Sequence, residues 1–151
     1  MVKFERPTPE AIKFIADNMR HADAVEVMAM CGYTPRQALR VSMECSRMSA
    51  VVLADGVPLA ILGLGVRDVL LGIGTPWLLS SEQAVKHKRQ FLELSPPVIQ
   101  EMLTICPKLV NYVHSENSLS IRWLKWLGFT MDEPLPIGIN GEMFHRFHME
   151  V

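Results

Sequence analysis

Two groups of side chains in the middle of the chain could do the chemistry of a binding or catalytic site. Lys86, His87, Lys88 and Arg89 form a run of basic side chains, and such groups can hold a phosphate through charge-assisted hydrogen bonds. A charge run of this kind is also typical of the solvent-facing side of a helix. Just before it, Glu82 could act as a general base in a cleft that raises its pKa, or could stabilise the first turn of a helix. Both interpretations stay open for each group.

The other histidines and the cysteines lack the spacing of a metal site. Cys31, Cys45 and Cys106 lie far apart, with no CxxC pair and no histidine at ligand spacing. His145 and His148 are three residues apart in an expected strand, so their side chains should face opposite sides. We therefore expect no metal site, and we expect the three cysteines to be free thiols in a reducing compartment.

Composition narrows the class of protein. The chain has 151 residues, of which 49% are hydrophobic, and 15 Lys and Arg residues stand against 16 Asp and Glu, for a net charge of -1. This length and hydrophobicity predict one domain over residues 1–151 with a packed core, and they exclude a disordered chain. A nearly neutral chain gives no support for nucleic-acid binding.

Neither a membrane span nor a secretion signal is expected. The longest apolar run, Val57–Val66, contains a proline and two glycines and has about half of the ~20 residues that a spanning helix needs. The N-terminal residues show no charged-then-apolar signal pattern and no small-residue cleavage site.

The first half of the chain predicts one strand, two helices and a β-hairpin. Met1–Glu5 alternates as a short strand does, and Thr8 followed by a proline predicts the start of a helix. Thr34, also followed by a proline, starts a second helix that reaches about Ser46. The dipeptide Asp55-Gly56 predicts a tight turn between two β-rich segments, which cover residues 49–54 and 57–66.

Prolines and glycines divide the middle of the chain. A third strand region covers Val69–Ile73 and Trp77–Leu79, broken at Gly74-Thr75-Pro76. A helix begins at the serines before Glu82 and ends at Ser95. Ser95 then caps a further helix, whose first positions are two prolines and which ends at Cys106-Pro107.

The last third predicts three strands around one helix. Leu109–His114 alternates as a strand, Asn117 or Ser118 caps a helix, and Gly128 ends it. Two strand-like segments follow, over residues 129–131 and 143–151. The predicted order is β-α-α-β-β-β-α-β-α-β-β, which indicates an α/β fold with a mixed central sheet and helices packed on it.

This order, together with the segment Asn117–Phe129, resembles the GNAT superfamily of acyltransferases. In that superfamily an Asn follows the fifth strand, and an amphipathic helix ends in Leu-Gly-Phe. The matching residues here are Asn117, the helix through Ile121–Trp126, and Leu127-Gly128-Phe129. The resemblance implies a GNAT-like mixed, twisted sheet with helices on both faces, in a single domain.

A narrower set of segments resembles the small internal virion protein of T-seven-like podophages, a family that carries a GNAT-like domain. The segments are Trp77–Val85, Lys88–Phe91, Leu109–Val113 and the helix Asn117–Gly128, and the similarity covers about residues 50–151. It implies a bacteriophage protein of the host cytoplasm and the virion interior. Its partners would be phage virion proteins or host proteins.

Two departures from the GNAT pattern favour a non-catalytic protein. GNAT enzymes hold the acyl-CoA pyrophosphate with a glycine-rich loop, and this chain has no glycine between Gly74 and Gly128. Many of them also place a tyrosine, as the acid for the CoA thiolate, where this chain has Leu124, which has no proton to donate. The main prediction is therefore a phage virion or assembly protein that acts through protein contacts on a degenerate GNAT fold.

The alternative is an acyl-CoA-dependent N-acetyltransferase with an unusual grip on the pyrophosphate of acetyl-CoA or CoA. The resemblance then implies Glu82 as the base and Lys86, Lys88, Arg89 and Asn117 around the cofactor, although Asn117 could equally be only a helix cap. An inhibitor that binds a host protein is a third class. The enzyme requires an open wedge between the fourth and fifth strands, lined by residues 78–80 and 111–114, whereas a filled wedge indicates an interaction protein.

Overall fold

A single seven-stranded mixed sheet runs through the molecule. The computed structural model describes all residues from Met1 to Val151. The sheet order is β1-β2-β3-β4-β5-β7-β6, and β4 and β5 form its one parallel pair. This confirms the predicted α/β fold with a mixed sheet. The strands are β1 (Val2–Glu5), β2 (Ser46–Ala54), β3 (Val57–Asp68), β4 (Ile73–Ser80), β5 (Lys108–His114), β6 (Thr130–Met131) and β7 (Phe144–Glu150).

Helices cover both faces of this sheet, as predicted. One face packs against α1 and α3 around Ile15, Leu39 and Ile61, and the other packs against α4 and α5 around Leu64, Met102 and Leu124. No helix combines the length and the apolar character needed to cross a membrane. The helices are α1 (Pro9–Asp17), α2 (His21–Cys31), α3 (Pro35–Glu44), the 3-10 helix η1 (Glu82–His87), α4 (Lys88–Ile105) and α5 (Ser118–Leu127).

Local capping signals account for the elements that were predicted well. Thr8 accepts a hydrogen bond from the Ala11 N–H at 3.1 Å, and Thr34 forms a capping box with Gln37. Asp55 and Gly56 both have positive φ angles, 48° and 81°, as the tight turn of a two-residue hairpin requires. Gly128, with φ 106°, ends α5 in the left-handed conformation.

Helix α2 was not predicted from the sequence. The residue before this helix, Arg20, makes no side-chain cap hydrogen bond, so the start of the helix has no local signal. Its apolar residues surround the helix instead of forming one stripe, because Val25 and Met28 are exposed while Ala29 is buried. The observed order therefore has three helices between β1 and β2.

The third strand was predicted correctly over Trp77–Leu79, but its start and its break were not. Residues 69–72 form a turn in which Val69, Leu70 and Leu71 are exposed, Leu70 to 96%. Strand β4 then continues without a break through Gly74-Thr75-Pro76. The carbonyl of Pro76 points towards β5, where it accepts a hydrogen bond from Asn111. The position of the absent N–H is on the same side, and β5 no longer pairs with β4 there. No sheet hydrogen bond is therefore lost at this proline.

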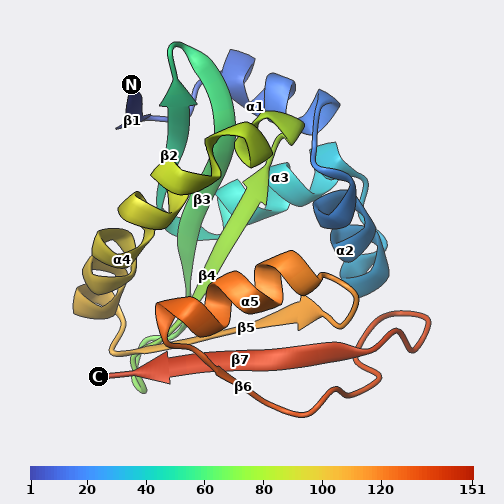
Figure 1. Cartoon of the computed structure of the whole chain (residues 1–151). Coiled ribbons are helices and arrows are strands. Elements are labelled where there is room, and N and C mark those ends of the chain that lie inside the picture. The colour runs from blue at the N-terminus through green and yellow to red at the C-terminus, as the bar shows by residue number, and fades with distance from the viewer.

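The predicted break at Ser95-Pro96-Pro97 is also wrong, since α4 runs through it. The Ser95 hydroxyl donates a hydrogen bond to the carbonyl of Phe91. Both prolines are exposed, so the carbonyl groups that lose their helical donors can bond to water. Phe91 before the prolines and Ile99 after them pack in the core beneath the helix, and the ribbon of α4 changes direction along its length (Figure 1).

Strands β4 and β5 meet at one end only. Their pairing is limited to Ile73 with Lys108 and Gly74 with Leu109. Beyond these pairs the strands point in different directions, and α2 lies on the side where they separate (Figure 1). This gap, called the wedge below, is the feature around which the candidate site is built.

We expect the closed end of the wedge to be intolerant of a larger residue at Gly74. A Cβ there would lie 2.8 Å from the Cys106 sulfur and 2.8 Å from a Leu64 methyl group. Gly74→Ala should therefore lower the free energy of unfolding by about 1–3 kcal/mol through overpacking, measured by urea denaturation. Thr75→Ala, whose side chain points to the other face, is the matched control. Equal midpoints for Gly74→Ala and wild type would contradict the expectation.

Candidate functional site

Two carboxylates of α2 bind the separated ends of β4 and β5. Asp23 accepts hydrogen bonds from the N–H and the hydroxyl of Ser80, at 2.8 and 2.6 Å. Glu26 accepts one from the N–H of His114 at 2.6 Å. The two acids are three residues apart and so lie on one face of the helix, which bridges the open end of the wedge.

A buried polar network extends from these acids to the start of α5. The guanidinium of Arg20 lies 2.8 Å from Asp23 and also donates to Asn117 and Ser120, at 3.2 and 3.0 Å. Asn117 in turn donates to Glu26 at 3.3 Å. All three bonds of the Arg20 side chain use one nitrogen, Nη2, so its Nη1 and Nε donors remain available.

Glu26 is the strongly perturbed acid of the protein. Burial raises the pKa of its carboxyl from 4.5 to about 7, although the hydrogen bond from the His114 N–H opposes this. The nearby charge of Asp23 raises the pKa further, while Asn117 and Arg20 lower it. A carboxyl group that titrates near neutral pH can take up and release a proton under physiological conditions.

A cavity of about 330 Å³, called the wedge cavity, passes between β4 and β5. Its lining includes Pro76 and Leu78 of β4, Asn111 and Tyr112 of β5, and residues from helices on both faces of the sheet. The lining is mostly apolar, and Asp23 and Glu26 are its only charged members. The side chain of Asn111 crosses part of the gap and donates to the Pro76 carbonyl at 2.7 Å. The wedge is therefore open, as the enzyme alternative requires.

A second cavity of about 270 Å³, called the cationic cleft, lies between η1, the start of α4 and α5. Three positively charged residues line it, Arg20, Lys88 and Arg122, together with Trp123 and Trp126. Trp126 is 57% exposed. The Trp123 indole N–H is buried and has no hydrogen-bond partner, and this residue lines both cavities.

Glu82 lies outside both cavities. Its carboxylate accepts a hydrogen bond from the N–H of His21, the first residue of α2, at 3.0 Å. The negative charge therefore lies at the positive end of the α2 dipole. Glu82 does not line the wedge cavity. Its role as a base remains a prediction.

The basic run at residues 86–89 is divided by the local fold. Lys88 lines the cationic cleft, whereas Lys86 does not. Arg89 is exposed and lies 3.4 Å from Glu93 on its own helix. His87 is near enough to Asp55 to help lower the pKa of that exposed carboxyl, which is lowered mainly by the N-terminal amino group. Of the run, only Lys88 lines either cavity, and contact of Lys86, Lys88 and Arg89 with a cofactor remains a prediction.

Asn117 is the N-cap residue of α5, as predicted, but its side chain makes no cap hydrogen bond. Its side chain is buried and joins Arg20 to Glu26. Contact with a cofactor remains a prediction for this residue.

The histidines of β7 lie beside Asp132. His145 Nδ1 is 2.8 Å from the backbone oxygen of Asp132, and His148 Nε2 is 3.0 Å from its side chain. No group of three His, Cys, Asp or Glu side chains is arranged to hold a metal ion. The three cysteines are unpaired.

Sequence reasoning missed Arg20, Asp23, Glu26 and Arg122. One signal was available for the two acids, since they are the only acidic residues of the otherwise largely apolar segment 21–31. Acids placed three apart in such a helix need partners if that face is buried. Their partners, Ser80 and His114, are far away in the sequence.

The fold is that of GNAT acetyltransferases. The chain is similar to an N-acetyltransferase from Staphylococcus aureus Mu50, with a TM-score of 0.74, 13% identity, and coverage of 99% of this chain and 98% of the other. It is similar to a ribosomal-protein-alanine N-acetyltransferase from Brucella melitensis, with a TM-score of 0.74, 13% identity and 99% of each chain covered. A spermidine N-acetyltransferase from Vibrio cholerae, solved with CoA and spermine, has a TM-score of 0.73 and 12% identity over 99% of this chain and 95% of the other.

These likenesses, all at low identity, show the fold and not the reaction. The sequence matches no protein-family model and no curated protein. None of these three similar structures is a phage virion protein. The GNAT-like resemblance is therefore confirmed at the level of the fold, and its narrower phage form has no support.

Glu26 should make stability depend on pH. Its pKa is raised in the folded state, so its stabilising contribution is complete below about 4.5 and is lost as the pH rises through about 7. In wild type, the free energy of unfolding should fall between pH 5 and pH 8 by about 2 kcal/mol more than in Glu26→Gln. Urea denaturation at both pH values measures the difference.

The control for this measurement is Glu116→Gln, which changes an exposed acid at the turn before α5. It should keep the wild-type dependence on pH. The same pH dependence in wild type and Glu26→Gln would show that Glu26 titrates normally.

Proposed function

We propose that the protein is an N-acyltransferase that moves an acyl group from acyl-CoA to an amine, with acetyl-CoA as the donor. The observation that carries this proposal is the open wedge, with a cationic cleft on one side and the titratable Glu26 at its wide end. Residues 1–151 act as one domain in this proposal. The fold similarity to acetyltransferases supports this alternative better than a virion protein acting through contacts.

The cationic cleft has the chemistry to hold the donor. Lys88, Arg122 and the free nitrogens of Arg20 offer charge-assisted donors for phosphate oxygens where the glycine-rich loop is missing. The exposed Trp126 ring offers a stacking face for an adenine base. The unpartnered Trp123 N–H, in the wall between the two cavities, suits a carbonyl oxygen of the donor.

Leu78 supplies a backbone donor for the negative charge that develops during acyl transfer. N–H directions alternate along a strand, and the Ser80 N–H and the Pro76 carbonyl both point away from β3. The N–H of Leu78, midway between them, therefore points into the wedge, where β5 is too far away to pair. A donor fixed in this position can stabilise an oxyanion.

Glu26 acts as the general base in this proposal. Acyl-CoA supplies a thioester, whose C–S bond breaks as the C–N bond to the amine forms. Glu26 takes one proton from the acceptor ammonium, which leaves the free amine that attacks the thioester. The nitrogen loses a second proton after the attack, and this proton goes to the departing thiolate. Leu124 cannot assist this transfer as a tyrosine could. A carboxyl with a pKa of about 7 is suited to this exchange at neutral pH. Asn117 and Arg20 position Glu26 and Asp23.

A phage origin, with a place in the host cytoplasm or the virion interior and with phage or host proteins as partners, has only the sequence resemblance behind it. An interaction protein would have a filled wedge between β4 and β5. The wedge contains a cavity instead, and this favours the enzyme.

Binding of acetyl-CoA should depend on Lys88 and Arg122. The double variant Lys88→Ala/Arg122→Ala should weaken the affinity about 10- to 100-fold, because each cation gives charge-assisted bonds to phosphate. Isothermal titration calorimetry measures the effect, which should diminish at high salt. The control Lys86→Ala/Arg89→Ala removes the same charge outside the cleft. Equal weakening in both pairs, or no wild-type binding at millimolar acetyl-CoA, would refute the proposed donor site.

Activity should depend on the ionisation of Glu26. With acetyl-CoA and an amine acceptor, kcat/KM should rise with pH and level off above about 7, following the pKa of this carboxyl. Glu26→Gln should lower the rate about 100-fold or more and remove this limb of the profile. Glu82→Gln is the comparison that tests the other candidate base. If Glu82→Gln alone removes the limb, Glu82 is the base and Glu26 is not.

A further inference from the structure

Residues of α2, α3 and the segment between them line one part of the wedge cavity, called the acceptor arm. Its lining is Val27, Met30, Cys31, Tyr33, Val41 and Trp77, with Glu26 at its edge. We propose that this arm selects as acceptor a small primary amine with an apolar aromatic or alkyl body and no carboxylate. This inference rests on the proposed acyl-transfer function and names its acceptor class.

The charged residues around the arm can pair with one ammonium group of an acceptor and with no carboxylate. No Lys, Arg or His lines the wedge cavity, so the carboxylate of an amino acid would have no counter-ion there. Asp23 is already paired with Arg20 at 2.8 Å and bound by Ser80. Glu26 is then the one carboxylate left for a cation, which leaves the second and third ammonium groups of a polyamine unpaired.

The rest of the arm favours an apolar body. The Trp77 ring is held in place, because its N–H donates to the Ser46 hydroxyl at 2.6 Å and the ring lies against Gly63, where a Cβ would come within 2.6 Å. Tyr33 and Tyr112 also line the cavity. Such fixed aromatic faces bind flat rings or alkyl chains well.

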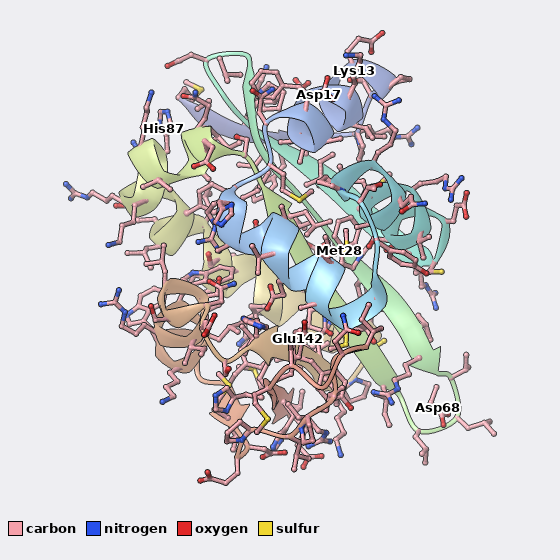
Figure 2. The ribbon with its side chains drawn as sticks, turned by 90° about the vertical axis from the view of Figure 1, so that its right-hand side faces the viewer. Lys13, Asp17, Met28, Asp68, His87 and Glu142 are labelled. Atoms are coloured by element: carbon pink, nitrogen blue, oxygen red, sulfur yellow. The ribbon has the colours of Figure 1, made fainter.

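The polarity and size of the cavity disfavour a peptide acceptor. Among its few uncharged polar residues, Asn111 already uses its amide on the Pro76 carbonyl and on the Tyr112 N–H. A peptide would therefore lose water from amide groups that find few partners in this cavity. A volume of about 330 Å³ is at the low end for small-molecule sites. Figure 2 shows α2, the helix that carries Met28, in front of the sheet, so this helix covers the cavity on that side.

A panel of amines tests the acceptor class. With saturating acetyl-CoA, release of the free thiol is measured for phenethylamine, hexylamine, phenylalanine, spermidine and a short peptide with a free N-terminus. Phenethylamine and phenylalanine differ only by the carboxylate. We expect kcat/KM for phenethylamine to exceed that for phenylalanine, spermidine and the peptide at least tenfold. A preference for any of these three over phenethylamine and hexylamine would overturn the inference while leaving the acyl-transfer function intact.

A charge placed in the lining should shift this selectivity. Ser42 lines the cavity from α3 and is half-buried, so Ser42→Lys adds a cation near the arm with little repacking. The ratio of phenylalanine to phenethylamine turnover should rise at least tenfold. Glu44→Gln changes the net charge equally on the same helix, outside the cavity, and should leave the ratio unchanged. An unchanged ratio in Ser42→Lys, with a Tm near that of wild type, would contradict the proposal.

Failure of the two proposals can be separated by binding. The acetyl-CoA titration tests the donor site independently of any acceptor. If no amine is acylated, calorimetry with phenethylamine and phenylalanine alone still tests the arm. Phenethylamine should bind at least tenfold more tightly than phenylalanine, because the carboxylate of phenylalanine has no counter-ion in the cavity, and both should bind more weakly to Glu26→Gln. Equal affinities, or tighter binding of phenylalanine, would overturn the acceptor class whatever the protein does with acetyl-CoA.

Discussion

Two backbone N–H groups, on Ser80 and His114, need partners because β4 and β5 separate before their ends. A buried N–H without a partner costs as much as a lost hydrogen bond, so the divergence of the strands is stable only if another element supplies acceptors. Helix α2 supplies them with two carboxylates one helical turn apart. The position of α2, the opening of the wedge and the environment of Glu26 all depend on this arrangement.

The same arrangement makes the two acids chemically different. Asp23 has a guanidinium 2.8 Å away and two donors from Ser80. The carboxyl group of Glu26 lies near the negative charge of Asp23 and accepts hydrogen bonds from His114 and Asn117, and its burial raises its pKa to about 7. One of the two carboxylates on this turn of helix is thus held by an ion pair, and the other has a raised pKa, because the groups around them differ.

Local signals in the sequence predicted the elements whose ends are fixed locally. Thr8, Thr34, Asp55-Gly56 and Gly128 each specify a cap or a turn through their own backbone preferences, and the corresponding elements were predicted correctly. Pro76 and the Ser95-Pro96-Pro97 segment were wrongly predicted to break a strand and a helix. A proline breaks an element only if the carbonyl opposite its missing N–H is left without another partner, and the sequence does not show this. Of the residues predicted around the site, Lys88 lines the cationic cleft, and residues 78, 79 and 111–113 line the wedge cavity. Arg20 lies three positions from Asp23, but the other partners of the two acids, Ser80, His114 and Asn117, lie more than fifty positions away in the sequence, where no local pattern predicts them.

All three tryptophans of the chain line the two cavities: Trp77 and Trp123 the wedge cavity, Trp123 and Trp126 the cationic cleft. The intrinsic fluorescence of the protein therefore originates almost wholly from the site and not from the core at large. Quenching or a spectral shift on adding a small molecule would report occupancy directly, with no label. An unfolding curve followed by the same signal would describe the loss of the site, so that comparison with circular dichroism would distinguish opening of the wedge from melting of the sheet.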